Sequence, residues 1–201
     1  MLFSDTYLTI ENEANIILKD KGSKFLAFAF PVENDAQIKD ALLQLKKEHP
    51  NANHHCYAYR LGADKLNYRA NDDGEPNNTA GKPILGQMQS NDLTNVLIVV
   101  VRYFGGTLLG VSGLINAYKS SAAEVIKECN IIEKFISFNY TISFAFEHLN
   151  DVMKLLKQTD CKIIAQQFDN DCEISFSIRK ANSEACEEKL KKLNGLKLTY
   201  Q

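Results

Sequence analysis

The sequence lacks several features that would assign it to a common functional class. No run of apolar residues approaches the roughly 18 that a membrane span requires, so we expect no membrane insertion. The chain begins MLFSDTYLTIENEAN, without the basic start and apolar stretch of a secretory signal. The five cysteines are odd in number, widely spaced and free of any Cys-x-x-Cys pair. This pattern favours free thiols in the cytoplasm and argues against a structural zinc site.

The sequence also lacks an excess of basic residues. It carries 23 lysines and arginines against 25 acidic residues, a net charge of −2, and neither half is basic. Non-specific binding to duplex DNA depends on many phosphate contacts, so we expect no duplex DNA partner. A local basic site remains compatible with this composition.

Arginine and glycine are scarce and unevenly placed. Of the four arginines, three lie at positions 60, 69 and 102, and eight of the ten glycines fall between Gly62 and Gly113. In a chain that otherwise prefers lysine, arginine indicates a need for its bidentate geometry. The middle third of the chain is therefore expected to hold the functional site.

The chain is organised around one segment, Val96 to Gly113. Six apolar residues from Val96 to Val101 predict a strand that is buried on both faces. Arg102 and a glycine-rich loop follow, and a helical pattern begins at Ser112. Glycine backbone, a helix start and an arginine fork can together bind an anion. The anion-binding candidates in this segment are Arg102, Gly105, Gly106, Gly110 and Gly113. The alternative is a tight turn that serves packing, with Arg102 paired to a carboxylate.

An unusual acidic loop, NDDGEPNNTAGKP, precedes this segment at positions 71–83. Its carboxylates are Asp72, Asp73 and Glu75. The loop is either a solvated surface turn, or a rigid element that binds a cation or orients Arg69 or Arg102. Thr79 is predicted to cap a short helix that runs through residue 89.

A strand with aromatic content is predicted at positions 54–61, HHCYAYRL. Alternation places His54 and Cys56 on one face, and Tyr57 and Tyr59 on the other. A His-x-Cys pair can ligate a metal, but two ligands without a second cluster are a weak signal, and packed side chains are the alternative. We therefore predict neither a metal nor a cofactor.

The remaining pattern predicts an α+β protein with two domains. Further strands are expected at positions 6–10, 15–18 and 25–32, with a helix whose apolar face is Ile38, Leu42 and Leu45, and a second helix at 112–129. From position 131 the expected order is strand (136–146), helix (148–158), strand (162–168), turn (169–171), strand (172–178), helix (182–193) and strand (196–200). That order predicts a ferredoxin-like βαββαβ domain.

Three motifs together resemble a known family. They are RYFGGTLLG after the valine-rich strand, DDGEP followed shortly by TAG, and HHCYAYR. In this order and spacing they are similar to those of the YigZ/IMPACT family, and the resemblance covers the whole chain. It implies an IMPACT-like domain at 1–132, with the fold of the second domain of a small-subunit ribosomal protein and of domain IV of elongation factor G. Positions 133–201 would be the ferredoxin-like C-terminal domain.

The resemblance also implies a shared functional surface. Carried over by position, this surface comprises His54, Tyr59, Arg60, Asp72, Asp73, Gly74, Glu75, Pro76, Thr79, Ala80, Gly81, Arg102, Gly105, Gly106 and Gly110. Asn78 departs from the family, which usually has glycine there. Asparagine tolerates left-handed backbone, so we expect the turn to survive, but a ligand that needs close backbone approach would be hindered.

Three functions remain open on this basis. The first is an RNA- or ribosome-associated binding protein with a role in regulation of translation, in which Tyr57, Tyr59 and Tyr103 can stack on bases. The second is a hydrolase-type enzyme acting on a phosphorylated small molecule with a divalent cation, in which Arg102 holds phosphate and His54 is an acid or base. The third is a regulator that binds a protein of the translation machinery and takes no small ligand.

Overall fold

The computed structural model describes residues 5–168, 171–193 and 195–200, and it divides into two compact units. The first unit is Tyr7–Lys134, and the second joins the start of the chain, up to Thr6, to Phe135–Gln201. The predicted boundary between 132 and 133 falls inside a strand, β7 (Ile131–Phe135). Of the predicted turn at 169–171, residues 169 and 170 lie outside the described part of the chain.

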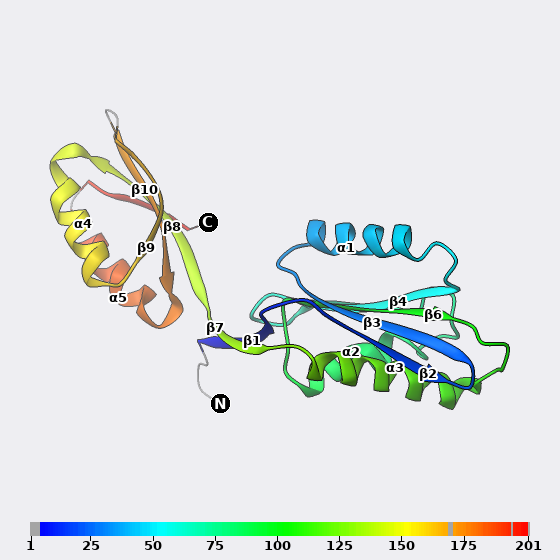
Figure 1. Ribbon diagram of the computed structural model, residues 1–201. Helices are drawn as coiled ribbons and strands as arrows, with labels where there is room; N and C mark the ends of the chain where they lie inside the picture. The colour runs from blue at the N-terminus through cyan, green and yellow to red at the C-terminus, as the bar shows by residue number, and fades with distance from the viewer. Residues whose placement is uncertain (1–4, 169–170, 194, 201) are drawn as a thin grey trace. The chain divides into compact units, whose positions relative to one another are not determined.

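The first unit is built on a five-stranded antiparallel sheet with helices on both faces (Figure 1). The strand order is β2 (Ala14–Asp20), β3 (Ser23–Pro31), β6 (Val96–Tyr103), β4 (His54–Leu61), β5 (Asn67–Asn71). Helix α1 (Asp35–Glu48) covers one face. Helices α2 (Gly81–Ser90) and α3 (Gly110–Lys127) cover the other.

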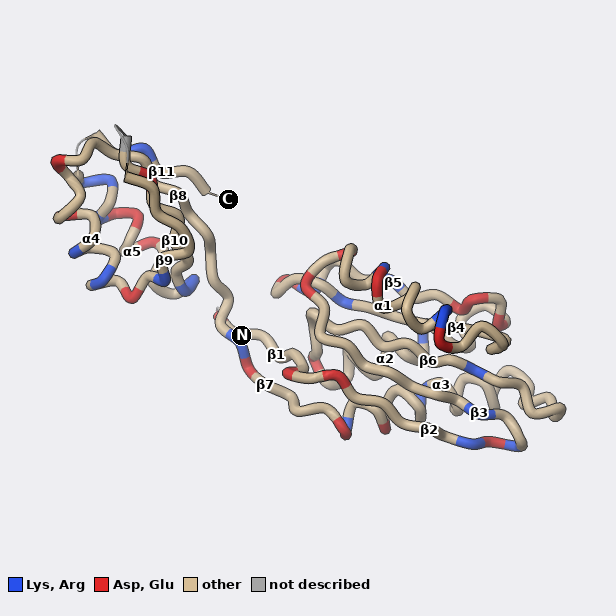
Figure 2. Tube along the Cα trace, turned by 45° about the horizontal axis from the view of Figure 1, so that its top comes forward, with Lys and Arg blue, Asp and Glu red and all other residues tan. Residues whose placement is uncertain are grey.

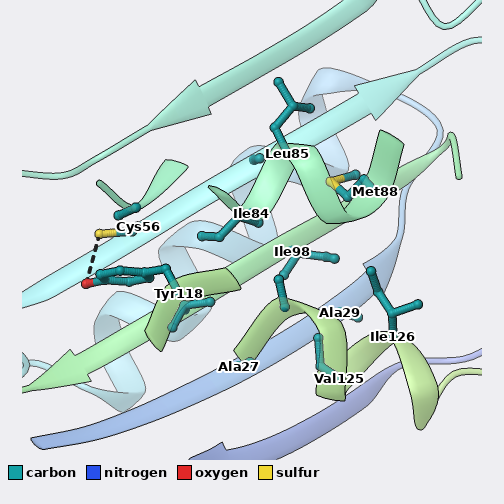
Figure 3. Close-up of a cluster of buried hydrophobic side chains, with 14 of the residues drawn as sticks. Ala27, Ala29, Cys56, Ile84, Leu85, Met88, Ile98, Tyr118, Val125 and Ile126 are labelled. Atoms are coloured by element: carbon teal, nitrogen blue, oxygen red, sulfur yellow. Dashed lines mark hydrogen bonds between the residues drawn. The ribbon is translucent and has the colours of Figure 1, made fainter. Parts of the chain in front are cut away.

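Strand β6 is the centre of this sheet, as its apolar run predicts. Every residue from Val96 to Val101 is fully buried. Alternation sends Val96, Ile98 and Val100 into the core beneath α2 and α3, and the intervening side chains into the core beneath α1. Figure 3 shows the first of these cores, where Ile98 lies among side chains of α2 and α3.

Two strands that the sequence pattern did not predict complete the first unit. Strand β5 is a largely exposed edge strand with no hydrophobic alternation. Strand β7 pairs with β1 (Thr6–Ile10) in a separate two-stranded sheet, and the Glu11 N–H donates to the Asn130 carbonyl at 2.9 Å just beyond it. Their existence depends on partners that are distant in the sequence.

The second unit has the predicted βαββαβ order. Its elements are β8 (Ser137–Ala145), the 3₁₀ turn η1 (Phe146–His148), α4 (Leu149–Gln158), β9 (Lys162–Phe168), β10 (Asp171–Arg179), α5 (Lys180–Lys191) and β11 (Lys197–Tyr200). The sheet order is β11-β8-β10-β9, with antiparallel neighbours. The buried side chains of β8 and β10 pack against those of α4 and α5, which confirms the predicted α+β class and the ferredoxin-like topology of this unit. None of the helices in the described part of the chain has the length and apolar character needed to span a bilayer.

Candidate functional site

Arg102 lies at the carboxyl end of β6, on the sheet face that α2 and α3 cover. The strand register places it between Phe25 of β3 and His54 of β4. Its guanidinium carbon lies 5.4 Å from the ring centre of Phe25 and 5.6 Å from that of Phe104. The side chain is only 6% exposed, so its charge needs a partner within the protein.

That partner is Glu75 of the acidic loop. Arg102 Nη1 donates to Glu75 Oε1 at 2.6 Å, and the Glu75 side chain is 4% exposed. The Tyr118 hydroxyl of α3 donates to the same oxygen at 2.8 Å, and the Cys56 thiol donates to the Tyr118 hydroxyl at 3.3 Å. Burial raises the pKa of Tyr118 and of Cys56 far above their usual values, so both groups stay protonated as donors. The loop thus orients Arg102, one of the two arginines that the sequence offered.

Asp72 holds the shape of the acidic loop. Its Oδ1 accepts hydrogen bonds from the backbone N–H groups of Ala80 at 2.9 Å and Gly81 at 2.8 Å. Its Oδ2 accepts one from the N–H of Asn78 at 2.8 Å. Asn78 has a positive φ of 64°, so the turn that usually carries glycine is kept here by asparagine.

Asp72 is also the cap of helix α2, and the prediction that Thr79 caps this helix is wrong. The helix begins at Gly81, and the Thr79 hydroxyl donates instead to the Pro76 carbonyl at 2.6 Å. A carboxylate accepts two N–H groups at the helix start, where one hydroxyl would accept one. A Cβ at Gly81 would lie 2.4 Å from the backbone nitrogen of Asn71, so the helix start also requires glycine.

Asp73 fixes the two histidines at the start of β4. Its carboxylate Oδ2 accepts a hydrogen bond from the backbone N–H of His55 at 2.6 Å, and its backbone carbonyl oxygen lies 2.8 Å from His54 Nδ1. Because a carbonyl can only accept, Nδ1 of His54 carries the hydrogen, and Nε2 of the neutral ring is an acceptor. This Nε2 lies 3.8 Å from Glu75 Oε1. His54 is therefore oriented so that its basic nitrogen is on the side of the buried ion pair.

A cleft of about 440 Å³ opens above the ion pair. Its polar lining comes from Asn53, His54, Glu75 and Arg102, and its apolar lining comes from Pro76, Phe104, Leu108, Leu109, Val111 and Leu114. At the rim, Leu108 is 84% exposed and Val111 is 59% exposed. Apolar side chains this exposed beside a cleft are typical of a binding surface.

The structure brings some of the predicted site residues together and separates others. His54, Glu75, Arg102 and Gly110, the first residue of α3, line the same cleft. Gly105 serves the loop backbone, because a Cβ there would lie 1.9 Å from the carbonyl carbon of Gly22. Gly106 has a positive φ of 86° in the same loop, and a Cβ at Gly113 would lie 3.0 Å from the side chain of Leu109, which precedes α3.

Arg60 and Tyr59 lie elsewhere. Arg60 is buried six residues from His54 along β4, a distance of about 20 Å, and its Nη1 donates to the Leu93 carbonyl at 2.9 Å. Tyr59 lines a separate cavity on the α1 side of the sheet, together with Arg69 and Asp73. Among the described residues, no group of three His, Cys, Asp or Glu side chains converges as a metal site would require.

A second exposed surface adjoins the cleft, and of its residues only Tyr103 was a candidate from the sequence. We call it the open sheet face: the part of β2, β3 and β6 on the α1 side whose side chains are exposed or only partly buried, namely Ile17, Lys19, Lys24, Leu26, Phe28 and Tyr103. Lys19, Lys24 and Tyr103 form one row across the three strands. The signal in the sequence is that every second residue of β3, starting with the charged Lys24 and continuing with Leu26 and Phe28, lies on this one face. Phe104 lines both a cavity at this face and the cleft, so it joins the two.

Comparison with known proteins assigns the family. The model of the Impact N-terminal domain matches residues 21–126, which is more than half of the chain and contains every residue that lines the cleft. The chain belongs to the IMPACT family. The resemblance of the three sequence motifs is thereby confirmed.

Two bacterial relatives in the IMPACT family match most of the chain, and a vertebrate relative matches about half of it. An IMPACT family member from Haemophilus influenzae is 33% identical over 186 residues, covering 90% of this chain and 89% of that protein. IMPACT family member YigZ of Escherichia coli is 32% identical over 166 residues, covering 82% and 81%. Protein IMPACT-B of Xenopus tropicalis is 38% identical over 98 residues, which is 46% of this chain and 30% of that protein. A crystal structure of a hypothetical protein, 29% identical, superposes with a TM-score of 0.77 and covers 98% of this chain and 97% of its own.

Proposed function

We propose that this IMPACT family member is an RNA- or ribosome-associated binding protein that regulates translation. RNA would contact the open sheet face and the cleft that Phe104 joins to it. The observation that carries this proposal is the row of Lys19, Lys24 and Tyr103 across three neighbouring strands.

The two lysines of this row favour an anionic partner. Lys19 and Lys24 lie directly opposite one another in the β2–β3 register, and both are exposed. Like charges in directly opposite positions destabilise a sheet, and a bound phosphate would relieve their repulsion. Figure 2 shows basic residues in blue along β2 and β3. Lys21, in the turn between the two strands, adds a third charge.

Partly buried rings on the same side of the sheet favour RNA over a simple anion. Phe28 and Phe30 are only partly buried, and their rings lie 6.4 Å apart and nearly parallel. Tyr103 is held in place by a hydrogen bond of 3.0 Å between its hydroxyl and His49 Nδ1. Unpaired bases stack on such rings, and RNA is read mainly at unpaired positions. The cleft would receive one such base against Phe104.

The charge of the protein predicts the strength and salt dependence of this binding. With about three lysines on phosphate, the logarithm of the binding constant should fall with the logarithm of salt at a slope of about −2, since each contact on a single strand contributes about 0.7. Binding is therefore expected to be moderate and to need recognition of particular unpaired bases.

The test is RNA binding by fluorescence anisotropy and co-sedimentation with ribosomes, at low and moderate salt. Lys19→Gln with Lys24→Gln should weaken binding and reduce the salt slope by about 1 to 2. The matched control is Lys82→Gln with Lys119→Gln, which removes the same charge from exposed positions on α2 and α3. The proposal fails if the unaltered protein binds neither RNA nor ribosomes at low salt, or if both double variants lose binding equally.

The apolar rim of the cleft favours a second candidate, a protein partner from the translation machinery. Leu108 and Val111 are exposed to a degree that a partner surface would cover. A stoichiometric partner should then be retained from nuclease-treated lysate and be lost with Leu108→Glu. Loss of the partner on nuclease treatment would favour RNA binding instead.

A further inference from the structure

The second unit holds two cysteine thiols in direct contact. Cys161 immediately precedes β9, and Cys186 lies in the middle of α5. Their sulfur atoms are 3.9 Å apart. The Thr159 hydroxyl lies 3.2 Å from the sulfur of Cys161 and 3.6 Å from that of Cys186. The three groups lie where α4 ends, β9 begins and α5 crosses the core.

The two thiols differ in access to solvent. Cys186 is buried, whereas Cys161 is only partly buried at the edge of the same core. Either sulfur can donate the hydrogen bond between them. The hydrogen bond from Cys161 lowers the pKa of Cys186, while the same bond and burial raise the pKa of Cys161. The pair thus combines a buried sulfur whose thiolate form is favoured with a neighbouring sulfur that is partly exposed.

A packed but inert pair is the alternative explanation. Core cysteines often serve as small apolar side chains, and burial keeps them unreactive. Cys172 of β10 shows that arrangement, since it is fully buried within the same core. What distinguishes Cys161 and Cys186 is the contact between two sulfurs, one of them partly exposed.

We propose that Cys161 and Cys186 form a thiol-oxidation site, at which hydrogen peroxide converts the two thiols into an internal disulfide. A thiolate of the pair attacks the peroxide O–O bond, its sulfur becomes a sulfenic acid, and the departing hydroxide takes up a proton to give water. The second sulfur then attacks the sulfenic sulfur, the S–O bond breaks, and a second water leaves with the remaining thiol proton. Two thiols and one hydrogen peroxide thus give one disulfide and two waters.

The bond requires only a local movement. The sulfurs must approach from 3.9 Å to about 2 Å, and they already lie in the same part of the core. The disulfide would join the start of β9 to α5 and close a loop that includes β9 and β10. It is expected to raise the unfolding temperature of the second unit, because the cross-link restricts its unfolded chain.

The test treats the full-length reduced protein with stoichiometric hydrogen peroxide, quenches it with an alkylating agent in acid, and analyses peptides by mass spectrometry. The expected product is a cross-linked Cys161–Cys186 peptide pair, two hydrogens lighter than the thiols and restored by dithiothreitol. Cys161→Ser should abolish it, while Cys172→Ser, in the same core, should leave it intact.

Cys161 is partly exposed, so its serine variant is expected to fold, and circular dichroism checks this. The proposal is overturned if all five cysteines remain alkylatable after peroxide treatment. It is equally overturned if Cys161 becomes sulfinic acid without cross-linking, or if the disulfides that form join separate molecules or other cysteines.

Discussion

The ion pair between Arg102 and Glu75 should be among the costliest interactions to break in the first unit. Removing one member of a buried ion pair costs about 3–5 kcal/mol, because the other charge stays buried without compensation. Arg102→Met would leave a carboxylate that is 4% exposed, with a hydroxyl donor from Tyr118 as its remaining close partner. Glu75→Gln would keep an amide oxygen near Arg102 but would leave the buried guanidinium, which also donates to Ser23 Oγ at 3.4 Å, without its negative partner. We expect each single variant to lose about 3–4 kcal/mol of unfolding free energy.

The double variant separates pairing from packing. If the cost of each single change is mainly an uncompensated charge, removing both charges should cost less than the sum by about 2 kcal/mol or more. Urea unfolding followed by circular dichroism gives the free energies. Hydrogen exchange of a peptide that spans β6 reports the first unit alone. The matched control is the exposed pair of Lys65 and Asp92, at 2.6 Å, which should be worth less than about 1 kcal/mol.

Two results would refute this reasoning. Additive costs in the double variant, with a coupling below about 0.5 kcal/mol, would mean that Arg102 and Glu75 do not depend on each other. Single variants no more costly than the Lys65 and Asp92 changes would mean that solvent reaches the pair.

Three further predictions concern the acidic loop and its neighbours. Gly81→Ala should destabilise the protein by about 1–3 kcal/mol, because its Cβ would lie 2.4 Å from backbone. Gly86→Ala in the same helix meets nothing within 4 Å and should stabilise the protein by about 0.5–1 kcal/mol. Equal unfolding temperatures for the two variants would contradict this. Burial lowers the pKa of His55 below its ordinary 6.5, so the unfolded chain takes up the proton first. Stability should fall as pH drops through 6.5 toward the lower folded value, and a pH series of unfolding temperatures should show a flatter slope for His55→Gln; an unchanged slope would assign the effect elsewhere. Asp72→Ala should cost about 2 kcal/mol or more of unfolding free energy through the lost helix cap. Neither Mg²⁺ nor a chelator should shift the unfolding temperature of the unaltered protein, because both Asp72 oxygens accept backbone N–H groups. A Mg²⁺-dependent increase that Asp72→Ala removes would show a cation site.

Features with a local signature could be predicted from the sequence. The run of six apolar residues at the start of β6 needs burial on both faces wherever it occurs, and the structure buries each of them. The βαββαβ order of the second unit was readable because elements such as β10 and α4 carry apolar residues at strand or helix spacing. Helix α3 begins at Gly110, two residues before the predicted start at Ser112, because glycine has no side chain and contributes nothing to a helical pattern.

Features that depend on distant partners could not be predicted. Strand β5 pairs with β4 at the edge of the sheet, so nothing in NYRAN itself marks a strand. The choice between Arg69 and Arg102 as the partner of Glu75 is made by the β4–β6 register, which sets Arg102 opposite His54. Tyr118 lies in the helix predicted at 112–129, but its hydroxyl bond to Glu75 depends on the acidic loop, which is distant in the sequence.

Strands β1 and β7 make the first unit resemble an insertion within the second. The polypeptide passes between the units twice, near Thr6 and near Phe135. On the far side of both crossings, Asp5 accepts a hydrogen bond at 2.6 Å from the backbone N–H of Ile136 and forms an ion pair with Arg179. Recombination that exchanged only the C-terminal part for another domain would therefore remove the partners of Asp5 and would cut close to the strand that pairs with β1. An exchange that preserved both units would have to join the chain at two places. We therefore expect gene fragments that end near residue 132, inside β7, to express poorly. Fragments that keep both β1 and β7 should express well.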